Sequence, residues 1–482
     1  MRFQRADGVI GWLMLLGMLL PGMMMARDAG QTDREPELAI DADLQPSQPA
    51  DDGDSELRRA EERVRSEESR GADGHALSAA YHQLGKAQLR AGHADAAVKS
   101  LQQALQLLAA TETLTSPRWI EPLIDLAEAD AALGEHAAAI EAMRQAIAIG
   151  RRSSGLFNVE QIELLERMAV SLEAVGDIAG VDRARRFAVL AAEQQFGSEH
   201  PDSVPAIERL ASWFELTGRY EMAGELYERT ATIAARESDG RSATVIHALL
   251  GLGRSHRLQY VETPELVDVG VWGLPPSQKY DPVTGQRKPI AGYILGRPRL
   301  DAAAKLDRRG RDALMQSLEI LGAVADPPPE LLASTFIEIG DWYQTDRDSA
   351  RAIAYYKRAW PLLEVANGSA FPNPLLAPRP MFYRLPPKLR QNRRMQQGQG
   401  VERRAEFVMT ISARGEVSEL AHTGGDMLEG NMWQVAHALN RATFSPRFEN
   451  GEPVATSGFA FTAFGFDPER EKAAAPAAAV ER

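Results

Sequence analysis

The sequence contains no cysteine in its 482 residues. Structural disulfides, thiolate zinc sites, a cysteine nucleophile and a cysteine-linked lipid anchor are therefore excluded. Positive charge is also scarce, because 54 lysines and arginines stand against 67 aspartates and glutamates, which gives a net charge of −13. Non-specific nucleic-acid binding needs a basic surface that releases phosphate counterions, so we expect no nucleic-acid partner.

Motifs of the common catalytic sites are missing too. The sequence has no phosphate loop, no His-Glu-x-x-His motif, no Gly-x-Ser-x-Gly motif and no dinucleotide fingerprint. His247 and His256 fall on one predicted helix, but they are nine residues apart and lack neighbouring carboxylates. We interpret them as surface or groove side chains rather than metal ligands. We therefore expect no catalytic residue, no bound metal and no cofactor.

A single long hydrophobic run lies at the N-terminus. A weakly basic start precedes an apolar stretch over residues 9–25, which Pro21 interrupts, and the small residue Ala26 follows it. This order is typical of a secretory signal, and the run is close to the shortest length that spans a bilayer. Residues 1–26 are thus predicted to be either a cleaved signal peptide or a retained signal anchor. We expect the protein to be exported, to the periplasm or to the inner membrane facing the periplasm.

Residues 27–72 are predicted to be a linker followed by a charged helix. The first part, residues 27–55, is acidic, rich in proline and poor in large apolar side chains. Such a segment cannot bury enough surface to offset its ordering entropy, so we expect it to be disordered. Residues 56–70 carry many charges of both signs, which is typical of a solvated helix.

Four glycines recur in strict phase along the next part of the chain. Gly92, Gly134, Gly176 and Gly218 are 42 residues apart, and the residue seven positions before each is small: Gly85, Ala127, Ala169 and Ala211. A fixed period in this range indicates stacked helix pairs, because one pair can bury its apolar stripe only against the next. Close helix crossings need small side chains, and each phased glycine is expected to end the first helix of a pair in a left-handed conformation.

These positions resemble the tetratricopeptide repeat, whose helix A carries Leu-Gly-x-x-Tyr and whose helix B carries Ala-x-x-x-Phe-x-x-Ala. The long unit is similar to the kinesin light chain variety, whose Gly-x-x-His-Pro-Asp linker is matched by Gly197, His200, Pro201 and Asp202. The resemblance implies an α-solenoid over residues 73–366. A generic alanine-rich helical bundle is the alternative.

The repeat pattern continues with an interruption. Gly253 belongs to a fifth unit, which a proline-rich insertion at 260–300 interrupts, with a predicted hairpin at 283–295. The insertion either contributes to a binding face or is an inert surface loop. A last unit spans 330–366 and carries Ile339-Gly340-x-x-Tyr343.

Residues 367–403 are rich in proline and arginine and are predicted to be a linker. Arginines cluster in and just after this segment, at Arg390, Arg393, Arg394, Arg403 and Arg404. The cluster either contacts an anionic surface, such as lipid headgroups, or is simply solvated.

The hydrophobic period changes from helical to alternating near residue 405. Strands are predicted at 407–411, 417–420 and 454–466, and a helix at 427–441 whose spaced apolar positions include Trp433 and Leu439. This β-β-α-β order predicts a small α+β domain at 404–468, followed by a disordered alanine-rich tail at 469–482. The expected fold class is therefore mainly α, an α-solenoid with a small C-terminal α+β domain.

The C-terminal segment resembles the C-terminal domain of TonB energy transducers. The matching positions are Gly415, Val417, Phe444, Pro446, Gly451 and Pro453. The resemblance implies that an open edge of the sheet binds a peptide by strand addition. In that family a long proline-rich spacer precedes the domain, whereas helical repeats occupy that stretch here.

Charged side chains on the first helix of each pair are candidates for partner binding. The resemblance to tetratricopeptide repeats implies that these helices line the concave face, which would be acidic in the middle and basic at both ends. The acidic positions are Glu121, Glu128, Glu163, Glu166, Glu173, Glu208 and Glu215, and the basic positions include His82, Lys86, Arg90, Arg254 and Arg257. Either these residues hold a partner of basic character or the glutamates are simply solvated helix formers.

We therefore predict a non-enzymatic interaction scaffold of the bacterial cell envelope. Its expected partners are proteins or peptides, including envelope or outer-membrane proteins, bound by the solenoid face and by the C-terminal sheet. The alternative is a membrane-anchored, TonB-like energy transducer for outer-membrane transport.

Overall fold

The computed structural model describes residues 52–237, 240–262, 278–280, 287–289, 296–366, 373–384 and 401–467. The predicted signal segment, most of the acidic linker, the cluster at 390–394 and the alanine-rich tail lie outside these residues. The described residues form two compact units, here called the N-terminal unit, which ends at Leu210, and the C-terminal unit, which begins at Ala211. No helix in the described ranges is long and apolar enough to cross a bilayer.

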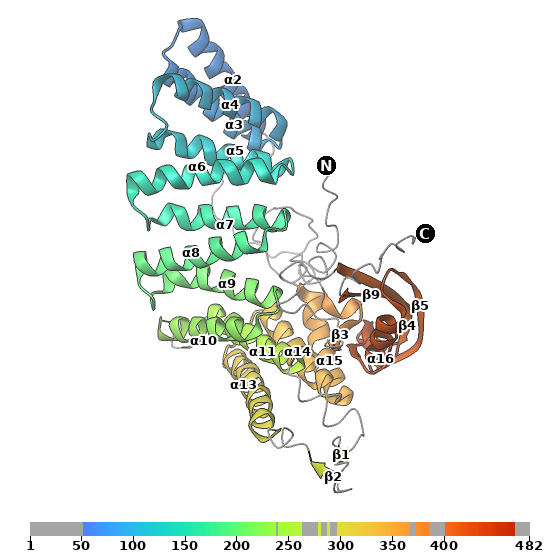
Figure 1. The fold of residues 1–482 in the computed structure, drawn as a ribbon. Coiled ribbons are helices and arrows are strands. Elements are labelled where there is room, and N and C mark those ends of the chain that lie inside the picture. Colours follow the sequence, from blue (N-terminus) through green and yellow to red (C-terminus); the bar gives the residue numbers. More distant parts are fainter. Residues whose placement is uncertain are drawn as a thin grey trace, which may run out of the picture. The chain divides into compact units, whose positions relative to one another are not determined.

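The N-terminal unit consists of stacked helices (Figure 1). They are α2 (Asp52–Arg70), α3 (Gly74–Arg90), α4 (Ala94–Thr111), α5 (Ile120–Ala132), α6 (His136–Ser154), α7 (Val159–Ala174) and α8 (Ile178–Phe196), with the 3₁₀ turns η2 (Pro117–Trp119) and η3 (Pro201–Ser203). Helix α9 (Val204–Leu216) contains the boundary with the C-terminal unit. The pairs α3–α4, α5–α6 and α7–α8 follow one another in a stack, so the predicted stacking of helix pairs is confirmed.

The phased glycines end the first helices of these pairs. All four have φ between +74° and +79°. At the end of α3 the Gly92 N–H donates to the Leu89 carbonyl at 2.9 Å, and the His93 N–H donates to the Gln88 carbonyl at 2.8 Å. These bonds satisfy carbonyls that a helix end leaves unpaired, and glycine adopts the left-handed conformation at little cost.

The small residues lie where the two helices of a pair cross. A Cβ atom added to Gly85 would be 2.5 Å from Cγ of Leu101, so a larger residue would displace α4. Ala127 and Ala169, at the same phase, are 1% and 0% exposed. The prediction that these small positions permit close crossings is therefore confirmed.

The C-terminal unit continues the helix pairs. Its long helices are α10 (Tyr220–Glu237), α11 (Ala243–Glu262), α13 (Gly296–Gly322), α14 (Pro329–Thr345) and α15 (Ser349–Ala366). Although the insertion separates them in sequence, α11 packs on α13, and a Cβ atom on Gly253 would be 2.6 Å from Cδ2 of Leu314. A Cβ atom on Gly340 would likewise be 2.5 Å from Cε1 of Tyr356. Both phased glycines thus serve close crossings.

Within the insertion, two short strands form an antiparallel pair. They are β1 (Gln278–Tyr280) and β2 (Arg287–Pro289). The first of these strands precedes the predicted hairpin at 283–295, the second lies within it, and the remaining residues of the predicted hairpin lie outside the described residues.

The rest of the C-terminal unit is an α+β arrangement. Its elements are η6 (Pro374–Leu376), β3 (Arg379–Phe382), β4 (Val401–Ile411), β5 (Val417–Gly425), α16 (Glu429–Leu439), β6 (Thr443–Ser445), β7 (Arg447–Glu449), β8 (Glu452–Val454) and β9 (Thr456–Asp467). One antiparallel sheet has the order β5-β4-β9, while β3 pairs with β6 and β7 pairs with β8. The predicted β-β-α-β order is present, and three short strands that were not predicted lie between α16 and β9.

The prediction of a linker at 367–403 is wrong over the described residues 373–384. These residues form η6 and β3, and Arg379 lies opposite Ser445 in the ladder with β6. Pro380 lacks an N–H but is tolerated because, among the residues that the structure describes, β3 pairs with a strand on one side only. Strand β4 begins at Val401, and Arg403 and Arg404 lie on it.

The C-terminal elements share a core with the last helix pair. Phe448 on β7 is fully buried, with its ring 5.9 Å from Tyr356 in an edge-on contact and 6.1 Å from Trp360 in a stacked one. Leu375 of η6 belongs to the same cluster as Tyr356. The α+β elements therefore pack against the last helix pair and share its core.

A second cluster fills the space between the sheet and α16. Phe407, Met409 and Ile411 of β4 pack against Val435 and Leu439 of α16. Trp433, one of the spaced apolar positions of the predicted helix, lies outside this buried cluster and is 66% exposed. Only one narrow stripe of α16 faces the sheet, and Trp433 lies outside it.

Candidate functional site

On the first helices of the N-terminal unit, arginines partly compensate the predicted acidic residues. Glu121, Glu128 and Glu163 are exposed. Arg167 lies between the last two, with Nη1 3.1 Å from the Glu128 carboxylate and Nε 3.2 Å from that of Glu163. Arg167 was not among the predicted residues, although its position four residues after Glu163 places both side chains on one helix face.

Two further glutamates of α7 share a second arginine. Nη2 of Arg185 on α8 is 3.4 Å from Glu173, and its Nε is 3.8 Å from Glu166. Glu166 is 7% exposed, and its Oε1 has no hydrogen-bond partner within the described ranges. Burial raises the pKa of Glu166, although Arg209 and Arg185 lower it. Arg185 replaces the large apolar residue that other repeats carry at this phase, so it supplies the counter-charge for α7.

Glu208 occupies the phase of Glu166 on the following first helix, α9. Burial raises the pKa of Glu208 to about 7, although Arg209 lowers it. Protonated and ionised Glu208 are therefore both populated near neutral pH. With Glu208 left out of the count because it is partly protonated, the carboxylates at 128, 163, 166 and 173 outnumber the guanidinium groups at 167, 185 and 209 by one. A modest acidic excess thus remains in this region.

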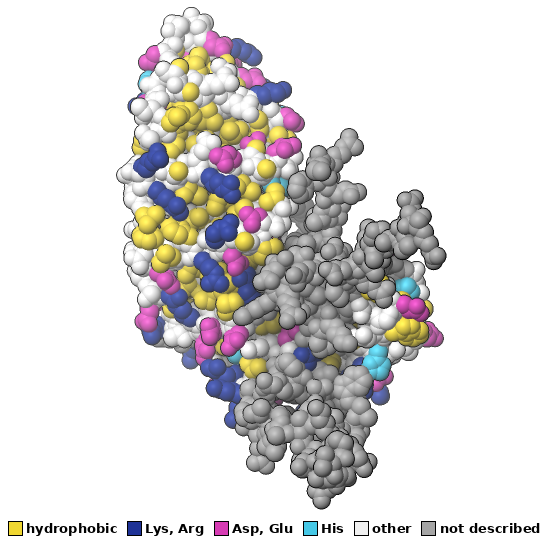
Figure 2. All heavy atoms as spheres, viewed as in Figure 1, with side chains coloured by type: hydrophobic (Ala, Val, Ile, Leu, Met, Phe, Trp, Pro, Cys, Tyr) yellow, Lys and Arg dark blue, Asp and Glu magenta, His cyan; other side chains and the backbone are white. Residues whose placement is uncertain are grey.

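The predicted basic end of the face is also partly compensated. Nε2 of His82 is 2.6 Å from the Asp125 carboxylate, and Arg90 pairs with Glu56 of α2. Lys86 is half-buried. The side of the N-terminal unit seen in Figure 2 carries basic, acidic and apolar side chains intermingled, rather than a patch of one sign.

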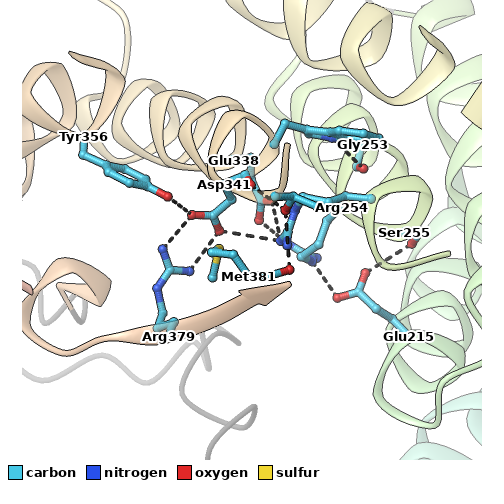
Figure 3. A network of polar contacts seen from close by, with 12 residues as sticks. Glu215, Gly253, Arg254, Ser255, Glu338, Asp341, Tyr356, Arg379 and Met381 are labelled. Carbon is cyan, nitrogen blue, oxygen red and sulfur yellow. Dashed lines mark hydrogen bonds and ion pairs between the residues drawn. The ribbon is translucent and has the colours of Figure 1, made fainter. Parts of the chain in front are cut away.

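In the C-terminal unit, charged side chains from α9, α11 and α14 form a buried network (Figure 3). The Nε of Arg254 is 2.5 Å from Glu215, and its Nη1 is 3.1 Å from Glu338. The Ser255 hydroxyl donates to Glu215 at 3.3 Å. Arg257 lies 3.5 Å from Glu338 and continues the network toward α15 and β3.

Asp341 on α14 joins Arg257 to residues of α15 and β3. Its side chain is 1% exposed and lies 3.6 Å from Arg257. The Arg379 guanidinium donates to both of its oxygens, at 2.8 and 3.0 Å, and the Tyr356 hydroxyl donates to Oδ1 at 2.8 Å. Burial raises the pKa of Tyr356 well above its usual value, and the negative charge of Asp341 adds to this effect. Tyr356 therefore acts only as a neutral hydrogen-bond donor.

Three acidic and three basic side chains balance within this network, at 215, 338, 341, 254, 257 and 379. The side chains of Glu215 and Arg257 are 9% and 6% exposed, and that of Arg254 is 27% exposed. The structure thus brings three predicted groove residues together, but in contacts with one another and with α14. Glu338, Asp341 and Arg379 were missed, and the only sequence signal was the position of Asp341 directly after the phased Gly340.

The three-stranded C-terminal sheet has two outer strands, β5 and β9. The pairing of β9 with β4 runs without a break from Val401 and Asp467 to Met409 and Phe459. The pairing of β5 with β4 is irregular at two places, and Glu419 has a φ of +52°. Regular outer strands present evenly spaced main-chain groups to an added strand, so β9 offers the better edge.

The C-terminal motif residues lie at turns and at the contact with α15. Gly415 has a φ of +83°, and a Cβ atom there would overlap the Phe444 carbonyl. The Phe444 N–H donates to the Gly415 carbonyl at 2.9 Å. Gly451 lies against Trp360, and Pro453 pairs with Phe448. The remaining motif residues, Val417 and Pro446, are half-buried and buried. Within the described ranges, no group of three or more histidines and carboxylates could hold a metal ion.

Comparison with protein families identifies two repeats. Models of the tetratricopeptide repeat match residues 78–107 and residues 206–241. The first match covers parts of α3 and α4, and the second covers most of α9 and α10. The chain therefore carries tetratricopeptide repeats. No curated protein sequence matches it significantly.

Solved structures of repeat proteins are similar to the chain at low identity. A putative kinesin light chain with nearly identical TPR-like repeats from Podosopora anserina is 22% identical, with a TM-score of 0.36, over 39% of this chain and 89% of that one. BtubC (BKLC) from P. vanneervenii is 17% identical, with a TM-score of 0.35, over 67% of this chain and 95% of that one. The C-terminal part of a repeat protein from Cytophaga hutchinsonii is 12% identical, with a TM-score of 0.39, over 64% and 93%.

Proposed function

We propose that this tetratricopeptide repeat chain is a non-enzymatic scaffold of the bacterial cell envelope, which binds protein or peptide segments on the first helices of its repeats. The observation that carries the proposal is the stack of helix pairs whose first helices expose Glu121, Glu128 and Glu163. Such a stack offers a long continuous surface and no enclosed reaction centre. The acidic excess around α7 favours a partner segment with basic side chains.

Export is part of the proposal and rests on the N-terminal sequence. The apolar stretch at 9–25 and the small residue after it are typical of a secretory signal. The absence of cysteine is compatible with an oxidising compartment, because no thiol needs protection there. The mass of the N-terminal peptide of the native protein tests whether residues 1–26 are removed.

The C-terminal sheet supplies a second contact in this proposal. Its resemblance to TonB C-terminal domains and the regular outer strand β9 both favour strand addition by an extended peptide. Hydrogen exchange of 456–467 with and without a captured partner tests this contact. We expect slower exchange of β9 amides when the partner is bound, whereas unchanged exchange would remove strand addition from the proposal.

The transducer alternative needs a C-terminal domain that reaches a distant receptor. Here Phe448 and Leu375 lie in the core of the last helix pair, and Arg379 binds Asp341. A domain held in this way cannot extend independently of the repeats. We therefore favour the scaffold. Removal of residues 1–26 from the native protein would support it, and their retention would favour the transducer.

We call the surface that carries Glu121, Glu128 and Glu163 the first-helix face. Charge reversal on this face tests the proposal. The variant combines Glu121→Lys, Glu128→Lys and Glu163→Lys, all at exposed positions. The matched control combines Glu141→Lys, Glu221→Lys and Glu225→Lys, which are exposed on α6 and α10. Quantitative affinity capture from cells should show at least about tenfold less of the principal partner with the first variant and no change with the control. Equal capture by both variants would exclude the first-helix face as the binding surface.

A further inference from the structure

The last helix pair carries arginines interleaved with aromatic rings. The arginines belong to its second helix, α15, whereas the proposed function is tested at the exposed glutamates of α5 and α7. We call Arg351, Arg358, Tyr343, Tyr355 and Phe336 the arginine–tyrosine face. Tyr343 and Phe336 belong to α14, and the other three residues belong to α15. Arg351 and Arg358 are exposed, and the two tyrosines are partly exposed. All five residues lie in the C-terminal unit.

The rings and guanidinium groups of this face stack on one another. The Tyr343 and Tyr355 rings are 5.6 Å apart with an interplanar angle of 13°. Cζ of Arg358 is 4.1 Å from the centre of the Phe336 ring and 5.6 Å from that of Tyr355. Cζ of Arg351 is 5.5 Å from the centre of the Tyr343 ring. These contacts hold both guanidinium groups over aromatic rings by cation–π attraction.

The two arginines differ in how far their charge is already compensated. Arg351 pairs with Asp348 at 3.4 Å, and its side chain remains 69% exposed. Arg358 has no carboxylate partner within the described ranges, and its recorded contacts are with the two rings. A third arginine, Arg311 on α13, lies 5.2 Å from the Tyr343 ring but pairs with Asp307 and Asp346. Free positive charge is therefore concentrated at Arg358 and partly at Arg351.

We propose that the arginine–tyrosine face binds an acidic peptide segment, with one carboxylate on Arg358, a second on Arg351 and the peptide backbone against Tyr343 and Tyr355. Residues 351 and 358 are two turns apart on α15, which places them about 10 Å apart along the helix. An extended peptide covers that distance in about three residues. A stacked guanidinium binds a carboxylate through two parallel N–H groups, so each pairing is directional as well as attractive.

A peptide fits this face better than a nucleic acid does. A nucleic acid brings a phosphate charge at every residue and needs a long basic groove to neutralise them. This face offers two available guanidinium groups on a chain whose net charge is −13. Two carboxylates three residues apart match that supply, whereas a continuous polyanion would be repelled by the rest of the surface.

Substitution of Asp348 tests the role of Arg351 in the proposed binding. It competes with the ligand for Arg351, and its Oδ1 also accepts a hydrogen bond from the Arg351 N–H at the start of α15. Asparagine accepts the same capping bond without carrying the charge. Asp348→Asn should therefore strengthen binding of an acidic peptide while leaving the helix start intact.

The experiment is fluorescence anisotropy with the full-length protein. The probe is a fluorescein-labelled peptide of about twelve residues with glutamate at every third position. The comparison probes are the same peptide with glutamine in place of glutamate and an oligothymidylate of similar length. The variants are Arg358→Gln, Arg358→Lys and Asp348→Asn, with Arg144→Gln as the control, because Arg144 is an exposed, ion-paired arginine on α6. Circular dichroism of each variant checks that the helices are retained.

The proposal expects saturable binding of the glutamate peptide and none of the glutamine peptide. Arg358→Gln and Arg358→Lys should each weaken binding by about tenfold, because lysine keeps the charge but loses the planar pairing. Asp348→Asn should strengthen it by about threefold, and Arg144→Gln should leave it unchanged. Equal binding of the oligothymidylate, full binding with Arg358→Lys, or no binding of the glutamate peptide to the wild-type protein would each overturn the proposal. None of these results bears on the first-helix face, so the proposed scaffold function is tested separately.

Discussion

Asp341 on α14 accepts two parallel hydrogen bonds from Arg379 on β3, at 2.8 and 3.0 Å. This pair joins the last helix pair to the segment that precedes the sheet. Arg257 and Tyr356 also contact Asp341. The carboxylate is 1% exposed, so these protein groups replace the water molecules that it loses on burial. A buried ion pair contributes more to a unique arrangement than to net stability, because both charges lose their hydration. The pair therefore fixes where β3 lies against the repeats.

Removal of one partner from this pair should be costly. Arg379→Gln leaves the Asp341 carboxylate buried with less compensation, and loss of a buried partner typically costs about 3–5 kcal/mol. The loss in the free energy of unfolding is measured by urea unfolding, with hydrogen exchange of the C-terminal unit as the readout. The control is Arg351→Gln, which breaks a solvent-exposed pair with Asp348 and should cost less than about 1 kcal/mol. Similar losses in both variants would show that burial of the pair is not what matters.

Phe448 should be essential for the last helix pair. Phe448→Ala leaves a cavity against Tyr356 and Trp360, and such truncations cost about 3–5 kcal/mol. We expect limited proteolysis to cleave α15 and the α+β elements together. Phe464→Ala, at a half-buried position on β9, serves as the control of equal size change. Loss of the sheet alone, with α14 and α15 still protected, would contradict the shared core.

The phased glycines should reject even a methyl group at the helix crossings. Gly340→Ala would place Cβ 2.5 Å from the Tyr356 ring, and overpacking of this kind costs about 1–3 kcal/mol. Gly430→Ala on α16 meets no atom within 4 Å and should raise helix stability by about 0.5–1 kcal/mol. Thermal unfolding of the two variants should therefore shift in opposite directions. A neutral Gly340→Ala would mean that α14 and α15 do not cross as closely as described.

Glu208 predicts a pH-dependent contribution to stability. Burial raises its pKa from the usual value of about 4.5 to about 7, so the folded state binds the proton more tightly than the unfolded state. Its contribution is complete below pH about 4.5 and declines as the pH rises to about 7. After allowance for solvent screening, the decline should be about 1–2 kcal/mol. Urea unfolding of Glu208→Gln at pH 5 and pH 8 should lack this part of the slope, and an unchanged slope would contradict the burial of the carboxyl group.

The repeats could be predicted because their determinants are local and periodic. Position 92 favours glycine because its backbone is left-handed, and position 85 requires glycine because a side chain there would collide with Leu101. Both requirements therefore appear in the sequence at fixed positions. The alternating pattern of Phe407, Met409 and Ile411 indicated β4 for the same reason. Secondary structure with strict periodicity is thus available from sequence alone.

The charged networks and β3 could not be predicted in the same way. Arg379 meets Asp341 from a proline-rich segment whose composition is typical of a linker. The pairing of β3 with β6 joins residues about 65 positions apart, and no local signal specifies it. Glutamates on the first helices looked free for the same reason, since the arginines that compensate Glu166 and Glu215 come from other helices.

Site-specific photo-crosslinking in cells tests the binding face most directly. A photoreactive amino acid replaces Val170 on α7, which is 61% exposed on the first-helix face, or Leu190 on α8, which is 40% exposed on a second helix. If the first helices bind the partner, Val170 should form a defined adduct that charge reversal at Glu121, Glu128 and Glu163 abolishes, while Leu190 should form none. Adducts of equal yield from both positions, or from Leu190 alone, would contradict the account.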